Sequence, residues 1–161
     1  MNTTLNIFKE ADWADLAQCQ GAGTEFDWFG RDKDGHLAVL SSAGSGPIPE
    51  AIWNHLREYN ALVTRIESLP AKGFVQVFQG SGRYEDWQDF AALGFFAFDY
   101  HDVHRVQKLG GYDLMARPNI LIDCSTLEAE LVSWIPVLNV AFNEAIFIPD
   151  AAIVGSTYRH A

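Results

Sequence analysis

The feature that most constrains the fold is a pair of strand-like runs joined by a tight turn. Residues 24–30 (TEFDWFG) alternate roughly between apolar and polar side chains, and residues 36–42 (HLAVLSS) form a second run of this kind. The segment between them ends in Asp34 and Gly35. An Asp-Gly pair between two such runs is a strong signal for a β-hairpin. The sequence therefore predicts an antiparallel pair of strands in this part of the chain.

A long amphipathic helix is predicted directly after the hairpin, over residues 47–69. Apolar side chains recur there at steps of three and four residues, which places them on one face of a helix. These side chains are Ile48, Ile52, Leu56, Tyr59, Leu62, Val63, Ile66 and Leu69. Pro70 and Gly73 are typical of the residues that end a helix.

The remaining segments alternate less regularly. The predicted elements are a helix with an acidic outer face at 8–19, a strand at 74–79, a helix at 84–93, a strand at 95–100, and short strands at 112–116 and 120–122 that Pro118 separates. The pattern leaves both helix and strand open for residues 127–134 and 137–148.

Length and element order together indicate the fold class. The 161 residues suffice for one core and are too few for two ordinary domains. Strands and helices do not alternate regularly, so a doubly wound parallel sheet is disfavoured. We expect a single α+β domain over residues 1–161, with a mainly antiparallel sheet, one long helix and shorter helices.

The composition narrows the classes of partner. Asp and Glu number 21 against 11 Lys and Arg, which gives a formal net charge of -10. Such a chain repels duplex DNA, and its charge suits either a basic protein partner or solubility alone. Cys19 and Cys124 are too far apart to signal a zinc ribbon or a disulfide framework. With no signal peptide pattern in residues 1–10 and no apolar run of about 20 residues, we expect a cytoplasmic protein without membrane contact or cofactor.

The stretch Gly44–Glu50 (GSGPIPE) has the look of a phosphate-binding loop. Such loops need several backbone N–H groups at a helix start, and the nucleotide-binding version also needs a Lys after the glycines. Pro47 and Pro49 have no N–H group, and no Lys or Arg is near. Proline in the first turn is a common way to begin a helix. We therefore interpret this loop as a structural turn into the long helix.

The sequence Asp99-Tyr100-His101-Asp102-Val103-His104 is the strongest candidate for chemistry. Its histidines and carboxylates are the side chains that metal ions prefer, so Asp99, His101, Asp102 and His104 form an alternative metal site. The simpler interpretation is a solvated loop after an apolar strand. No G-x-S-x-G nucleophile motif occurs, and no catalytic residue is assigned.

Tryptophans beside acidic residues favour protein binding instead. Glu25-Phe26-Asp27-Trp28 and Glu85-Asp86-Trp87 place an aromatic ring next to carboxylates, and such rings can anchor a basic protein. Seven acids and only three Lys or Arg occur before residue 35. The candidate contact residues are Asp12, Asp15, Glu25, Asp27, Trp28, Asp32 and Asp34.

Three segments carry a resemblance to a group of small acidic bacterial proteins. These are residues 26–49 (FDWFGRDKDGHLAVLSSAGSGPIP), 93–100 (LGFFAFDY) and 112–123 (YDLMARPNILID). Together they comprise 44 of the 161 residues. The resemblance implies an immunity protein that inhibits a bacterial toxin, and it implies no active site. The SUKH immunity superfamily is similar in size and class, but its Leu-Pro, Tyr and Asn-Gly-Gly pattern is absent here.

Three hypotheses follow from the sequence. The first is a non-enzymatic protein that binds a basic partner such as a toxin. The second is a metal-dependent enzyme that uses the Asp99–His104 segment. The third is an oligomeric structural protein, for which a homodimer is the simplest form.

Overall fold

The computed structural model describes residues 5–78 and 85–154. The helices are α1 (Glu10–Gln18), α2 (Leu56–Glu67), α3 (Glu85–Leu93), α4 (Ala129–Val132) and α5 (Asp150–Val154), with 3-10 helices η1 (Glu50–Asn54) and η2 (His101–His104). The strands are β1 (Asp27–Arg31), β2 (Leu37–Ser41), β3 (Val75–Val77), β4 (Phe96–Asp99), β5 (Gly111–Pro118) and β6 (Phe147–Pro149). None of the helices in these two ranges is long and apolar enough to cross a membrane.

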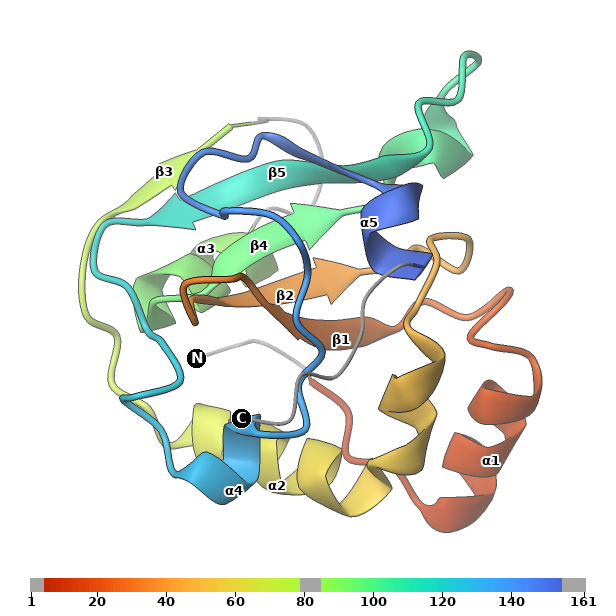
Figure 1. The fold of residues 1–161 in the computed structure, drawn as a ribbon, viewed down its shortest axis with the longest axis horizontal. Coiled ribbons are helices and arrows are strands. Elements are labelled where there is room, and N and C mark those ends of the chain that lie inside the picture. Colours follow the sequence, from red (N-terminus) through yellow and green to blue (C-terminus); the bar gives the residue numbers. More distant parts are fainter. Residues whose placement is uncertain (1–4, 79–84, 155–161) are drawn as a thin grey trace.

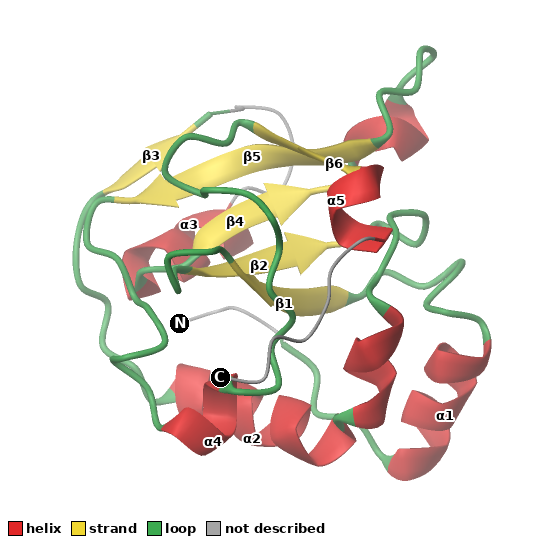
Figure 2. Cartoon of the chain, in the orientation of Figure 1, coloured by secondary structure: helices red, strands yellow, loops and turns green. Residues whose placement is uncertain are grey.

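The strands form one mixed sheet in the order β1-β2-β4-β5-β3, and β6 also pairs with β5. Only β2 and β4 pair in parallel, and the other pairings are antiparallel. The predicted α+β class with a mainly antiparallel sheet is therefore confirmed (Figures 1 and 2).

Helices cover the sheet unevenly. Helix α3 packs on β4 and β5 behind the sheet in Figure 1, while the segment that leads to β6 and α5 crosses the front. Helices α2 and α4 lie together beside β1 at the bottom of the view. Aromatic side chains fill the space between α2, α1 and β1, where the ring of Tyr59 contacts Trp13, Phe26 and Phe29. The Tyr59 hydroxyl donates to the carbonyl oxygen of Asp27 at 2.7 Å and so ties α2 to the start of β1.

The predicted hairpin is present. Strands β1 and β2 pair from Asp27 opposite Ser41 to Arg31 opposite Leu37, and Gly35 has a φ of 89° in the turn. A positive φ is easily adopted only by glycine, which explains the Asp-Gly signal.

The predicted long helix is interrupted. Residues 50–54 form η1, His55 has φ -127° and ψ 42°, and α2 begins only at Leu56. The carbonyl oxygen of Trp53 accepts the indole N–H of Trp13 at 2.8 Å. Because that carbonyl bonds outside the helix, the regular α-helical ladder does not run through this point. The apolar stripe is present, but residues 50–54 form a separate 3-10 helix that is hydrogen-bonded to α1.

Of the two short strands predicted on either side of Pro118, the one at 112–116 is present as part of a longer strand. Strand β5 runs unbroken from Gly111 to Pro118, and Pro118 is its last residue, opposite Val75. Proline is tolerated there because the end of a strand needs no further N–H donor. The predicted strand at 120–122 is wrong, since the Ile122 N–H donates to Gly94 in a loop contact instead.

The loop before η1 has the structure of a turn. The N–H groups of Ser45 and Gly46 both donate to the carbonyl oxygen of Ser42, at 3.0 and 2.8 Å, so they are already used within the loop. The loop's glycines differ, because Gly44 has a φ of 72° whereas Gly46 is crowded by two tyrosines. A Cβ atom at Gly46 would lie 2.5 Å from the Tyr112 hydroxyl oxygen and 2.8 Å from Cγ of Tyr100. Close packing, rather than a positive φ, therefore explains the glycine at 46.

Candidate functional site

A row of polar side chains crosses four neighbouring strands at one end of the sheet. Asp27 of β1 pairs with Ser41 of β2, Ser41 with Asp99 of β4, and Asp99 with Asp113 of β5. Residues directly opposite each other in a sheet point to the same face. The sheet therefore holds three carboxylates in one row, with Ser41 between Asp27 and Asp99, where β2 and β4 end and β1 begins.

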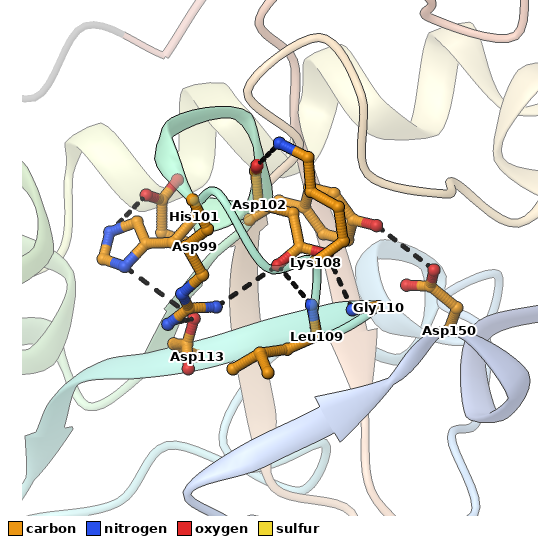
Figure 3. A network of polar contacts seen from close by, with 10 residues as sticks. Asp99, His101, Asp102, Lys108, Leu109, Gly110, Asp113 and Asp150 are labelled. Atoms are coloured by element: carbon orange, nitrogen blue, oxygen red, sulfur yellow. Dashed lines mark hydrogen bonds and ion pairs between the residues drawn. The ribbon is translucent and has the colours of Figure 1, made fainter.

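Short contacts link this row to the segment after β4. The Ser41 hydroxyl donates to Asp27 Oδ1 at 2.5 Å. Nε2 of His101 lies 2.9 Å from Asp99 Oδ2, and its Nδ1 lies 3.8 Å from Asp113 Oδ2 (Figure 3). The guanidinium of Arg105 is 2.8 Å from that same Asp113 oxygen. Since both ring nitrogens of His101 face carboxylates, the ring is well placed to hold the strands together and poorly placed to act as a free base.

The carboxylates in this row repel one another. Burial, followed by the charges of Glu25, Asp86 and Asp99, raises the pKa of Asp27 to about 6, against the lowering effect of the Ser41 hydrogen bond. Burial and the charges of Glu25 and Asp113 raise the pKa of Asp99 to about 6 as well. Burial lowers the pKa of His101, although Asp113 acts in the opposite direction. At neutral pH the row therefore carries negative charge that its own surroundings disfavour.

Helix α3 and the segment before β1 complete the site. We call its members the sheet-end cluster: Glu25, Asp27, Ser41, Asp86, Trp87, Asp99, His101 and Asp113. Glu25 and Asp86 are exposed, whereas the side chains of Asp99 and Asp113 are only 12% and 13% exposed. The ring of Trp87 meets that of His101 edge to face, with centroids 6.4 Å apart.

Trp87 differs from the other tryptophans of the chain. Trp13, Trp28, Trp53 and Trp134 are all buried in the core. Trp87 is half-buried, and it stands among the acidic side chains of the sheet-end cluster.

The four residues of the predicted metal site do not share one position. Asp99 and His101 are in contact, and the charge of His104 lowers the pKa of Asp99. Asp102 faces elsewhere, since its carboxylate accepts the N–H groups of Leu109 and Gly110 at 3.0 and 2.7 Å (Figure 3). These bonds, together with Arg105, lower the pKa of Asp102. Asp102 therefore anchors the loop between η2 and β5 rather than facing Asp99 and His101.

A second group of Asp and His side chains lies at the opposite end of the hairpin. We call Asp32, Asp34 and His36 the turn cluster, and in the described part of the chain they are the one such trio whose possible metal-ligand atoms lie within 4.8 Å of one another. Asp32 is buried and accepts the N–H groups of Asp34, His36 and Phe142, each at 2.9 Å. Nδ1 of His36 lies 3.0 Å from Asp32 Oδ2, the oxygen that also accepts the Phe142 N–H. This carboxylate is satisfied by the fold itself, which favours a structural role.

The predicted contact residues do not form one surface. Asp12 and Asp15 are exposed on α1, Glu25 and Asp27 belong to the sheet-end cluster, and Asp34 lies at the other end of β1. Trp28 is 0% exposed, and its indole N–H donates to the Tyr112 hydroxyl at 3.1 Å. Trp28 is thus a core residue and not an exposed anchor. Asp32 is also buried, so it does not belong to a contact surface.

Sequence reasoning did not single out Asp113. It named Asp86 and Trp87 as a ring beside carboxylates but did not include them among the candidate contact residues. A two-residue Asp34-Gly35 loop would pair Lys33 with His36 and hence Asp27 with Ser42, whereas the structure pairs Asp27 with Ser41. Nothing in the sequence indicated that Asp99 and Asp113 belong in the same row.

Comparison with known protein families, with curated proteins and with solved structures finds no match for this chain.

Proposed function

We propose that this protein is a non-enzymatic, cytoplasmic binding protein that receives a basic protein partner at the sheet-end cluster. The partner class that the bacterial resemblance implies is a toxin, which the protein would inhibit. The observation that carries this proposal is the position of Trp87. The one tryptophan outside the core stands among acidic side chains, and an aromatic anchor beside carboxylates suits a surface that binds Lys and Arg.

The electrostatics of the cluster support a cationic ligand. Asp27 and Asp99 ionise against burial and against the negative charges around them. A Lys or Arg side chain placed near them would offset that repulsion. The stabilisation of the two ionised carboxylates would then contribute to the free energy of binding. The net charge of -10 would also steer a basic partner toward the protein and raise its association rate.

An apolar loop beside the cluster supports the same proposal. The loop between η2 and β5 projects from the molecule at the upper right of Figure 1, and it exposes Val106 and Leu109. Its base is held by Asp102, which accepts two of its N–H groups, and by Arg105, which joins Asp102 and Asp113. An apolar tip on an anchored base can contact a partner with little loss of conformational entropy.

The test compares two pairs of substitutions that change the net charge equally. Glu25→Gln with Asp86→Asn removes two charges from the sheet-end cluster, and Asp12→Asn with Asp15→Asn removes two from α1. Each tagged protein is used to capture partners from the host lysate, and each is assayed for rescue of growth against the captured protein.

We expect a basic protein that is captured and neutralised by the wild type and by the α1 pair, and is bound at least about tenfold more weakly by the sheet-end pair. Trp87→Ala should weaken binding to a similar degree. An acidic partner, or equal weakening by both pairs, would contradict the proposal.

A further inference from the structure

Strand β3 lies at an edge of the sheet, and the sequence around it is symmetric. Strand β3 is the last strand of the sheet order, and among the described residues no strand pairs with its outer edge. The other edge differs, since β1 is partly covered where Arg31 bonds Pro136 and Leu138. Residues 74–78 read FVQVF, which is the same in both directions about Gln76.

Hydrogen bonds show which backbone groups of β3 face outward. The Phe78 N–H donates to Met115, and the Phe74 carbonyl accepts from Asn119, so residues 74 and 78 bond toward β5. Backbone direction alternates along a strand, which places the N–H and C=O groups of Val75 and Val77 on the outer edge. Exposed edge groups of this kind are a template for another strand.

Apolar side chains accompany this edge. Phe74 is 86% exposed and Phe78 is 39% exposed, and both lie on the side of β3 away from the half-buried Val75 and Val77. Ile120 and Ile146, also exposed, flank the strand at its two ends, next to Phe74 and Phe78. Natural edge strands usually carry charges or prolines that block pairing, and β3 has neither.

The local charge removes the main obstacle to self-association. The molecule carries a net charge of -10, so two copies repel each other over most approaches. Residues 70–78 contain Lys72 and no acid, and Arg117 of the neighbouring strand lies over the ring of Phe78 at 5.3 Å. Residues 70–78 therefore bring no carboxylate of their own to this edge.

We propose that β3 is a dimerisation strand, which pairs antiparallel with β3 of a second copy about a two-fold axis through Gln76. A two-fold interface requires a patch that is complementary to itself. In this register Val75 faces Val77 of the second copy as a hydrogen-bonded pair, and Phe74 faces its Phe78 as a closely spaced non-hydrogen-bonded pair. This register requires the N–H and C=O groups of Val75 and Val77 to point outward, and they do. The symmetry of the sequence and the direction of the backbone hydrogen bonds therefore support the same pairing.

The test uses opposite charges at the two-fold axis. Gln76→Lys and Gln76→Glu each place like charges face to face in the dimer, and a mixture of the two variants places opposite charges there. Ala61→Lys and Ala61→Glu, on the exposed side of α2, are the matched controls. Molar mass is measured by light scattering after size exclusion, over a range of protein concentrations, with circular dichroism to verify folding.

We expect a wild-type dimer, a dissociation constant about 100-fold higher for either Gln76 variant alone, a dimer restored by mixing them, and no effect at Ala61. Val77→Pro provides a second test that leaves charge unchanged, because it removes an outward N–H that the monomer does not use. It should also abolish the dimer. A monomeric wild type, an open-ended aggregate, or a dimer that survives both Gln76→Lys and Val77→Pro would overturn the proposal.

Discussion

The turn cluster and the sheet-end cluster both contain Asp and His and lie at opposite ends of β1 and β2, but their carboxylates have different hydrogen-bond partners. Asp32 of the turn cluster receives three backbone N–H groups and faces His36. Asp27 of the sheet-end cluster receives one side-chain hydroxyl and faces further carboxylates. The two carboxylates therefore differ in their supply of hydrogen-bond donors, which satisfies Asp32 within the fold and leaves the charge of Asp27 opposed by its surroundings.

Removing the Asp32 carboxylate should produce the largest effect. Asp32→Ala leaves the N–H groups of Asp34, His36 and Phe142 without their acceptor. We expect the free energy of unfolding to fall by about 3 kcal/mol, measured by urea denaturation. The control is Asp34→Ala in the same turn, because the Asp34 side chain is exposed and should contribute less than about 1 kcal/mol. A loss below 1 kcal/mol for Asp32→Ala would show that the turn does not depend on this carboxylate.

Removing the charge of Asp27 should produce a smaller effect of the opposite sign. Asp27→Asn keeps an oxygen that can accept from Ser41 and removes the repulsion by Glu25, Asp86 and Asp99. At pH 8 we expect the free energy of unfolding to rise by about 1–2 kcal/mol.

The pH dependence of that gain provides its check. The folded pKa of Asp27, about 6, lies above the unfolded value, so the folded wild type binds more protons between about pH 4 and 6. Its free energy of unfolding therefore falls as pH rises through this window, and the advantage of Asp27→Asn should vanish by about pH 4. Asp12→Asn removes a charge from α1 and serves as the control. A destabilised Asp27→Asn at pH 8 would contradict the account of the sheet-end cluster.

Local patterns predicted the elements that depend on local physics. The Asp34-Gly35 signal predicted the β1–β2 hairpin, and the acidic outer face and buried Trp13 of α1 follow from helical periodicity. The register itself was not predicted, because the loop is one residue longer than Asp34-Gly35 and therefore pairs Asp27 with Ser41 instead of Ser42. The interpretation of Gly44–Glu50 as a turn agrees with the use of its N–H groups inside the loop.

The rest depended on contacts between distant segments. The parallel pairing of Ser41 with Asp99 joins strands separated by more than fifty residues, and no local pattern specifies it. The break at His55 arises from the Trp13 indole that bonds the Trp53 carbonyl across forty positions. Trp28 and Trp87 both follow an acid in the sequence, and only the packing buries one and leaves the other at the surface.

The most direct test of the central claim is a carbon-13 NMR titration of the aspartate side-chain carboxyl carbons. The account predicts that Asp27 and Asp99 titrate with midpoints of about 6, because burial and neighbouring carboxylates oppose their ionisation. Both midpoints should fall in the Glu25→Gln, Asp86→Asn variant, most strongly for Asp27, which both acids act upon. Midpoints near 4 for both residues in the wild type would show that the sheet-end cluster holds no opposed charge and would contradict the account.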